Sequence, residues 1–347
     1  MSLISVSVLR KNIVVLFEGA GLSPDNSDIV TDILLDAEVS GITTHGISMV
    51  PAHIEKLRNN SYSVNDELEV EREGTGFTVF NANNMIGMLS AYKAMEKAIA
   101  LSRGKGIQMV LCNHANTYSA GAYYVKMAVK MGLIGIAACN APAQMAPLGG
   151  KEKMLGTNPF SIGVPAKNEA PFIFDMATSI VAKSKINEII RNGGATIPEG
   201  WATDSDGNPT TDPLEAVKGM ILPMAGAKGY GLCMSIDILA GLMSGAAYLD
   251  KVGRFYPLDN GCMNVGHLFI SIDPKELYGE DFYDDMDEYL NEIRSSESAS
   301  SRRIIAPGDD KQEIMRKNME NGLNVSDRLI DELNSLAKEL CIGTLNW

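Results

Sequence analysis

The chain has 347 residues, and its 45% hydrophobic and 21% charged composition is that of a soluble globular protein with room for two domains. The formal net charge of −13 argues against nucleic acid and anionic membranes as partners, because both attract clusters of lysine and arginine. No uncharged apolar run reaches the roughly 18 residues that a membrane-spanning helix needs.

The five cysteines are odd in number, widely scattered and mostly set in apolar segments, a pattern typical of buried, reduced thiols. We therefore expect a cytoplasmic protein, and the N-terminal segment lacks the features of a secretory signal peptide. The sequence has no C-x-x-C or H-x-x-x-H pair and only four dispersed histidines, so no metal site is expected.

In chain order, apolar residues at three- and four-residue spacing predict helices over residues 5–20, 25–40 and 50–57, so the first seventy residues are expected to be helical. Beyond residue 76 strands alternate with helices, which indicates an α/β core. The expected strands cover residues 76–83, 107–113, 133–140, 160–164, 172–175 and 266–273, and the expected helices cover 85–102, 120–131 and 230–247. Residues 279–301 are expected to form an acidic helix and a mobile linker, and the last thirty-five residues to form helices that pack on the opening ones.

Several expected strands are bordered by short polar clusters: Asn113, Asn140-Ala-Pro142, Gly156-Thr-Asn-Pro159 and Asp175-Met-Ala-Thr-Ser179. Each cluster alone is most simply a turn, because Asn, Asp, Pro and Gly favour turns. Ligands of open α/β sheets bind in the crevice outside the strand ends, so the series together indicates one shared crevice.

The segment Gly226–Gly231 precedes an expected helix and carries Lys228. It does not give the G-x-G-x-x-G pattern of a Rossmann domain. Glycines at a helix N-terminus together with a lysine suit a phosphate group, and the alternative is a flexible turn with a solvated lysine.

His45 lies in the stretch GITTHG, where the second helix ends. One interpretation is a cap, because the helix dipole favours histidine at a C-terminus. The other is chemical, since a histidine beside the hydroxyls of Thr43 and Thr44 can exchange a proton with a substrate oxygen near neutral pH.

Seven blocks in order, GITTHGI, NAPAQMAPLGG, GTNPFSIGVPA, FDMATSIVAKSKI, IPEGWATDSDGNPTTDP, LPMAGAKGYGL and NVGHLFISIDP, resemble the malate/L-lactate dehydrogenase family of NAD(P)-dependent oxidoreductases, which includes ureidoglycolate and sulfolactate dehydrogenases. The resemblance implies a non-Rossmann central α/β cofactor domain and a mainly helical domain built from both chain ends. We assign residues 71–311 to the dinucleotide-binding domain, and residues 1–70 with 312–347 to a helical substrate and dimer domain. The resemblance also implies a homodimer with the active site near the subunit interface.

The same resemblance implies that a dinucleotide lies against Asn140, Ala141, Pro142, Thr157, Asn158, Pro159, Asp175, Met176, Ala177, Lys228, Pro307, Gly308 and Asp309. NAD is the expected cofactor, with NADP left open.

Two positions depart from the family's pattern. The first block usually reads Ser-His-Gly-x-x-Arg, and here Met49 stands in place of the arginine that would hold a substrate carboxylate. A second block, aligned on Tyr123-Tyr124, places Asn116 and Thr117 where relatives have Asn-His, so a proposed proton acceptor is replaced by a threonine. His53 or His114 could substitute for it.

The resulting hypothesis is an NAD(P)-dependent oxidoreductase that moves a hydride between nicotinamide and a small 2-hydroxy or 2-oxo acid or a related carbonyl compound. His45, assisted by Thr44, would transfer the proton, and Thr117, Met49, His53 and Asn116 would shape the catalytic and substrate pocket. The alternatives are a dinucleotide-binding sensor or structural partner with weak or lost turnover, and a ketimine reductase.

Overall fold

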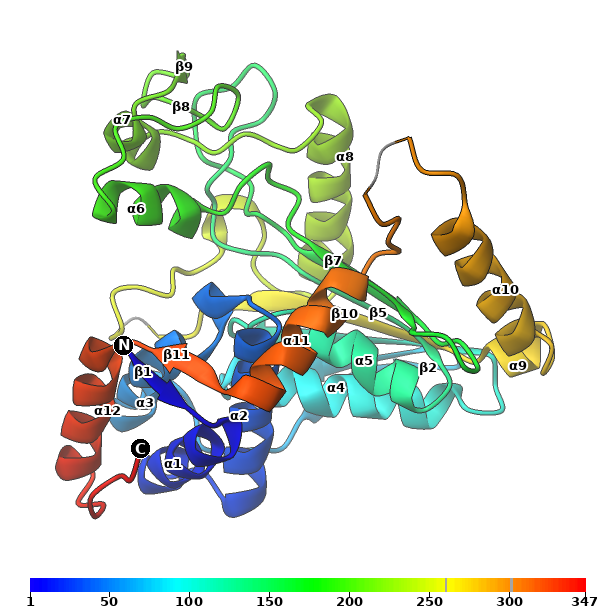
Figure 1. Ribbon diagram of the computed structural model, residues 1–347, viewed down its shortest axis with the longest axis horizontal. Coiled ribbons are helices and arrows are strands. Elements are labelled where there is room, and N and C mark those ends of the chain that lie inside the picture. The colour runs from blue at the N-terminus through cyan, green and yellow to red at the C-terminus, as the bar shows by residue number, and fades with distance from the viewer. Residues whose placement is uncertain (260, 300–301) are drawn as a thin grey trace.

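The computed structural model describes residues 1–259, 261–299 and 302–347. At its centre is a seven-stranded sheet in the order β2-β3-β4-β10-β5-β6-β7 (Figure 1). The strands are β2 Glu69–Gly74, β3 Phe77–Asn81, β4 Ile107–Ala115, β10 Val265–Ile272, β5 Ile134–Cys139, β6 Phe160–Val164 and β7 Phe172–Met176. Only β3 and β4 pair in parallel, and every other neighbouring pair in this sheet is antiparallel.

The register brings the polar clusters to a single edge of the sheet. His267 at the start of β10 faces Cys112 near the end of β4 and Cys139 at the end of β5. Farther along the sheet, Phe160 at the start of β6 faces Met176 at the end of β7. The clusters therefore lie at one edge of the sheet, and the 156–159 cluster precedes its strand because β6 runs in the opposite direction to β5 and β7.

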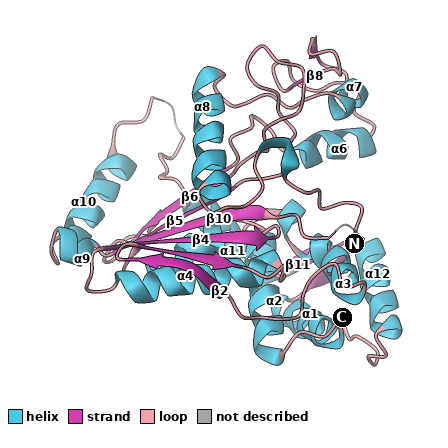
Figure 2. Ribbon diagram, turned by 180° about the vertical axis from the view of Figure 1, so that it is seen from behind, coloured by secondary structure: helices cyan, strands magenta, loops and turns pink. Residues whose placement is uncertain are grey.

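Helices cover both faces of the sheet (Figure 2). One face carries α4 (Gly87–Ser102) and α5 (Ala122–Lys130), and the other carries α8 (Ala227–Ile236) with its π-helical continuation η3 (Asp237–Leu242). Neighbouring strand residues point to opposite faces. Val110 and Phe269 accordingly belong to the main core on the α4 and α5 side, whereas Leu111 and Leu268 pack with Ile236 of α8.

The two chain ends form a helical region beside the sheet (Figure 1). It contains α1 Val6–Gly19, α2 Pro24–Val39, α3 Val50–Arg58, α11 Asp309–Asn321 and α12 Asp327–Glu339. Ser5 and Ser23 accept hydrogen bonds from the first turns of α1 and α2, as N-cap residues do. The C-terminal helices contact the opening ones, as expected, and the short strands β1 (Ser2–Ile4) and β11 (Leu323–Val325) also pair.

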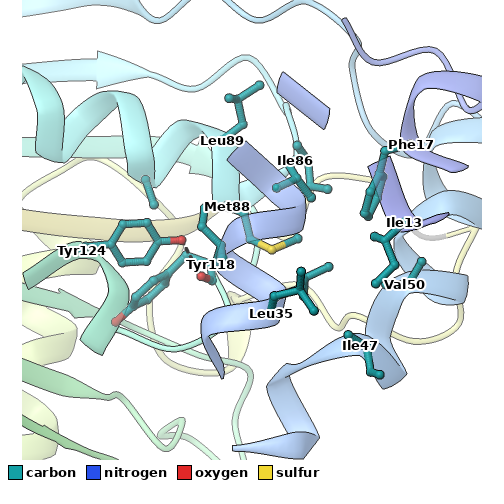
Figure 3. Packing of buried hydrophobic residues seen from close by; sticks show 14 of the residues in the cluster. Ile13, Phe17, Leu35, Ile47, Val50, Ile86, Met88, Leu89, Tyr118 and Tyr124 are labelled. Carbon is teal, nitrogen blue, oxygen red and sulfur yellow. Dashed lines mark hydrogen bonds between the residues drawn. The ribbon is translucent and has the colours of Figure 1, made fainter. Parts of the chain in front are cut away.

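The main core continues from this helical region into the layer below the sheet. Figure 3 shows side chains of its first three helices, among them Ile13, Leu35 and Val50, gathered with Met88 and Leu89 of α4. The two regions therefore share one buried cluster. The helical region is held directly against α4 and α5, which fixes its position relative to the sheet edge.

A smaller subdomain stands above the sheet edge, beside α8 (Figure 1). It contains α6 Lys183–Arg191, α7 Pro213–Lys218, β8 Ala202–Thr203 and β9 Pro209–Thr210, around a core of Ile186, Ile197, Ala202 and Ala216. The chain then reaches β10, α9 (Pro274–Leu277) and α10 (Phe282–Ser295). The sequence analysis predicted the acidic helix α10 but neither the helices nor the strands of this subdomain.

Two expectations about element boundaries need correction. Residues 69–74 form the edge strand β2 rather than a helix or loop, and four of these six residues are charged because the strand is exposed. The expected boundary at 70/71 therefore falls inside β2, and the one at 311/312 falls inside α11. The linker expected within 279–301 includes residues 300–301, which lie outside the described residues. Across the described part of the chain, no helix has the length and apolarity to cross a bilayer.

Phe269 provides a test of the main core. Its ring is fully buried in β10 and contacts the rings of Tyr118 and Tyr124, so Phe269→Ala is expected to lower the free energy of unfolding by about 3–5 kcal/mol. Phe77→Ala, at a position 37% exposed on β3, is the matched control and should cost about 1 kcal/mol or less. Urea denaturation measures both variants, and equal losses would show that β10 is not at the centre of the core.

Candidate active site

Two short 3₁₀ turns carry His45 away from the end of α2. They are η1 (Thr43–His45) and η2 (Ile47–Met49). The backbone N–H of Ile47 donates to the Glu38 carboxylate at 3.0 Å, and the Ser119 hydroxyl donates to the His45 carbonyl at 2.7 Å. The turn is therefore held from the helix on one side and from the sheet edge on the other.

Gly46 is required by the closeness of Glu38. A Cβ at position 46 would overlap the Glu38 carboxylate, so no larger residue fits between His45 and Ile47 without moving this group. Glu38 is buried, and the loss of hydration raises its pKa to about 7, although the bond from Ile47 lowers it. The glycine of GITTHG is therefore required for packing against Glu38, and the adjacent histidine is exposed.

The His45 imidazole lies beside the Thr44 hydroxyl and feels the negative charge of Asp175. Thr44 Oγ1 is 3.0 Å from His45 Nδ1. The side chain touches solvent but is surrounded by enough protein that partial desolvation lowers its pKa, while the negative charge of Asp175 raises it. A lowered pKa leaves the imidazole neutral at neutral pH, so His45 can accept a proton and, once charged, is stabilised by Asp175.

Asp175, at the end of β7, is held in place by two donors. The Ser161 hydroxyl donates to its Oδ1 at 2.6 Å and the Ala122 backbone N–H to its Oδ2 at 3.3 Å. Burial raises the pKa of Asp175, and these two bonds lower it. Asp175 was expected to contact the cofactor only. The register of β6 and β7 pairs it with Ser161, a contact that the sequence alone does not display.

The side-chain amides of Asn140 and Asn158 stabilise the sheet edge through hydrogen bonds to other parts of the protein. Asn140 Nδ2 donates to Asp237 Oδ1 at 3.0 Å and to the Ala247 carbonyl, and its Oδ1 accepts from Gly266. Asn158 Nδ2 donates to the Cys233 carbonyl of α8 at 3.0 Å, and its Oδ1 accepts from Ala141. Both residues are buried, so their side chains hold α8 and η3 to the edge rather than pointing into the crevice.

Asn116 and Asp309 are also occupied by internal contacts. Asn116 is buried and donates to Asn84 and Met85, so its amide supports the backbone next to Thr117. Asp309 forms a two-point ion pair with Arg294, with N···O distances of 2.7 and 3.1 Å. The expectation that these two side chains contact substrate or dinucleotide therefore does not match their placement in this structure.

The other cofactor candidates lie where a ligand can reach them. Pro142, Thr157, Pro159, Met176 and Ala177 are partly exposed along the sheet edge. Pro307 and Gly308 line a cleft of about 770 Å³ together with Asp175, between the end of α2, α5, β7 and α11.

Lys228 is exposed in the first turn of α8. The N-cap of this helix is Gly226, with φ of +59°, and no side chain caps the turn. This arrangement fits an anionic group, because uncapped N–H groups and a lysine face the same end of the helix.

The remaining histidines differ in accessibility. His53 is buried between Tyr62 and Phe255, and burial followed by the charge of Lys56 lowers its pKa to about 3. His267 is buried with its Nε2 2.9 Å from the Asn116 carbonyl, and burial lowers its pKa to about 4. His114 is exposed at the sheet edge. Only His114 therefore remains as an accessible rival to His45.

Met49 and Thr117, the two positions at which a departure from the family pattern is expected, lie in different settings. Met49 is partly buried and packs against the main core beneath the His45 turn. Thr117 is partly exposed and follows the buried Asn116 at the sheet edge.

Glu38 gives a pH-dependent prediction for the folded site. Its pKa rises from 4.5 in the ordinary case to about 7, so the folded chain holds a proton that the unfolded chain releases, and stability falls as pH rises from about 4.5 to 7. Glu38→Gln removes this titration. Its stability relative to the wild type should rise by up to about 3 kcal/mol across that window. Urea denaturation at both ends of the window measures the change, and a constant difference between the two proteins would refute the raised pKa.

Comparisons with known proteins identify the family. A family model described as malate/L-lactate dehydrogenase matches residues 4–334. The chain is 36% identical to malate/(S)-sulfolactate dehydrogenase of Methanothermus fervidus, over 99% of this chain and 100% of that protein. It is 31% identical to ureidoglycolate dehydrogenase (NAD(+)) of Escherichia coli, over 91% of this chain and 90% of that one.

A solved structure agrees with these matches. The fold superposes on sulfolactate dehydrogenase from Methanocaldococcus jannaschii with a TM-score of 0.92 and 34% identity, over 98% of each chain. The agreement extends over nearly the full length of both proteins. The chain therefore belongs to the malate/L-lactate dehydrogenase family.

Proposed function

We propose that the protein is an NAD(P)-dependent oxidoreductase that moves a hydride between nicotinamide and a small 2-hydroxy or 2-oxo acid. The observation that carries this proposal is the match to the malate/L-lactate dehydrogenase family over residues 4–334, together with the His45 turn that Ser119 ties to the sheet edge. The similarity to malate, sulfolactate and ureidoglycolate dehydrogenases supports the substrate class.

The residues of the chain have distinct roles in this proposal. When bound, the dinucleotide supplies or accepts the hydride. His45 gives a proton to the substrate oxygen during reduction and takes it back during oxidation. Asp175 stabilises the charged form of His45, and the Thr44 hydroxyl orients the ring through Nδ1. Ser119 and Glu38 hold the turn that carries the histidine.

The cofactor-binding part of the proposal rests on the accessible residues only. Met176, Ala177 and Thr157 at the edge would hold the nicotinamide end, and Lys228 with the first turn of α8 would neutralise a phosphate. Asn140 and Asn158 act as positioning residues that fix this edge. Either NAD or NADP is compatible with these contacts.

The residue types at positions 49 and 117, a methionine and a threonine, indicate a substrate pocket that differs from that of the family pattern. A thioether cannot form the two charge-assisted hydrogen bonds that an arginine gives a carboxylate, so the acid group needs another partner. The same departures favour the rival function, a dinucleotide-binding sensor with little turnover, because loss of a proton-transfer group typically costs about 10²–10⁴-fold in rate. We favour turnover because His45 keeps both its charge partner and its hydroxyl.

A measurement of cofactor oxidation distinguishes the oxidoreductase from the dinucleotide-binding sensor and from the ketimine reductase. Wild-type protein is titrated with NADH and NADPH by fluorescence, and 2-oxo acids, non-carboxylate carbonyls and cyclic imines are then added to the same samples. The enzyme proposal expects binding followed by oxidation with at least one 2-oxo acid. Tight binding with no oxidation across the panel would favour the sensor, and oxidation only with cyclic imines would favour a ketimine reductase.

His45→Ala tests the proton-transfer role. It should lower kcat by about 10²–10⁴-fold while leaving the dissociation constant of the cofactor nearly unchanged. His114→Ala is the matched control, because His114 is exposed at the same edge and lacks the Asp175 partner assigned to His45. Full turnover in His45→Ala, or a comparable loss in His114→Ala alone, would contradict the assignment.

We further propose that the protein is a homodimer and that its interface includes one face of α8 and η3, in addition to the helical region of the two chain ends expected from the sequence. Five large apolar side chains on this face are 38–53% exposed: Met234, Ile238, Leu239, Leu242 and Met243. Contiguous exposed apolar patches in water typically mark interaction sites. The opposite side of the same helix carries Cys233, whose carbonyl accepts from Asn158, so the interface would lie one helix away from the crevice.

Leu242→Asp tests the interface. A buried aspartate would be unpaired, so the variant is expected to have the monomer mass of 37.4 kDa by light scattering, whereas the wild type has twice that mass. Leu277→Asp is the control, because Leu277 on α9 is 67% exposed and lies away from this face. A monomeric wild type, or equal masses for the two variants, would contradict the proposal.

A further inference from the structure

A second cavity, of about 350 Å³, lies between the sheet edge and the small subdomain. It is formed by the segment after β5, by the start of α6 and by the loop that precedes β10. Its lining residues are Pro142, Ala143, Gln144, Lys153, Lys183, Gly219, Ile221, Arg254, Phe255 and Tyr256. Pro142 is one of the partly exposed cofactor candidates along the sheet edge, so the cavity borders the expected cofactor site.

Three cations from distant parts of the sequence meet in this cavity: Lys153, Lys183 and Arg254. Lys153 Nζ donates to the Lys218 carbonyl at 3.0 Å, which fixes its position. The residues described as lining the cavity include no aspartate or glutamate. The wall is therefore strongly positive in a protein whose net charge is −13.

The cations are near enough to act on one another. Burial lowers the pKa of Lys153, and the charges of Lys183 and Arg254 lower it further. Burial followed by the charge of Arg254 lowers the pKa of Lys183 in the same way. Bringing like charges together costs free energy, and an anion in the cavity would offset that cost.

The first turn of α6 adds to the positive field. Lys183 is the first residue of this nine-residue helix, and its N-cap, Ala182, has no side-chain hydrogen bond to the first turn. An uncapped helix N-terminus favours an anion through its free N–H groups and the helix dipole. The cavity therefore combines three side-chain charges with a helix terminus.

We propose that this cavity binds an oxyanion, a phosphate or a sulfonate or carboxylate group of equivalent charge. The binding of the oxyanion does not depend on the proposed function, but the identity of its natural source does. Two sources fit: the 2′-phosphate of NADP, or the second acid group of a dianionic 2-hydroxy acid such as malate or 3-sulfolactate. If the second source is correct, the cavity would hold the substrate by its second acid group. This would help to bind the substrate in a chain that has Met49 in place of an arginine.

Inorganic sulfate is the probe for the site itself. Calorimetric titration at constant ionic strength is expected to show saturable binding to the wild type. Lys183→Glu should weaken it by about tenfold or more, because an attractive charge is replaced by a repulsive one. Lys183→Arg keeps the charge and should retain binding, and Lys185→Glu is the matched control, because Lys185 is exposed on the same helix and is not among the lining residues.

The proposal is overturned if the wild type binds no sulfate, or if Lys183→Glu and Lys185→Glu weaken binding equally. These results do not involve turnover, so they are independent of whether the enzyme proposal holds. A failure of that proposal would instead appear as the absence of cofactor oxidation by the wild type.

Measurements on Lys183→Glu then show whether the bound oxyanion belongs to the cofactor or to the substrate. Weaker binding of NADPH with unchanged binding of NADH would identify the 2′-phosphate. A higher KM for oxaloacetate or malate, with unchanged KM for pyruvate or lactate and unchanged cofactor binding, would identify the second acid group of the substrate. Either outcome supports an oxyanion in the cavity.

Discussion

The packing of the helical region against the sheet is the constraint on which the candidate site depends, because it brings the His45 turn within range of the negative charge of Asp175. The histidine comes from a turn that follows α2, and the carboxylate comes from the end of β7, more than a hundred residues later. Their closeness requires that the helical region be held against the sheet, and the shared core around Leu35, Val50 and Met88 provides that support. A neutral imidazole that an adjacent carboxylate stabilises when charged is suited to carry a proton in both directions.

The functional edge of this sheet is built differently from that of a parallel α/β sheet. Only β3 and β4 pair in parallel, so the edge combines the ends of some strands with the starts of others. Buried asparagines keep this edge rigid, since Asn140 and Asn158 join it to η3 and α8. Rigid support of this kind matters because hydride and proton transfer need groups held close to their reacting geometry.

Much of this architecture could be predicted from the sequence, and each failure has a physical reason. The three- and four-residue spacing of apolar residues predicted the first three helices, and the strands expected after residue 76 correspond to β3, β4, β5, β6, β7 and β10. Strand β2 was missed because its exposed and mostly charged residues lack the apolar pattern of a buried strand, although it forms a hairpin with β3. The pair β1–β11 was missed because it joins the two ends of the chain. The sequence blocks that resemble the family also identified candidate site residues. They could not show which way each side chain points. Asn140, Asn158 and Asp309 use their polar groups in internal contacts, and the charge of Asp175 acts on His45 only because the helical region packs against the sheet.

The most direct test follows the titration of His45 by NMR in histidine-labelled wild-type protein and in Asp175→Asn, with the His45→Ala spectrum assigning the signal. Because the Asp175 charge raises the pKa of His45 against the lowering effect of burial, its removal should move the His45 pKa to a lower value. Glu188→Gln, an exposed acid on α6, should leave the titration unchanged. An unaltered His45 pKa in Asp175→Asn would contradict the pairing and with it the proposed proton-transfer site.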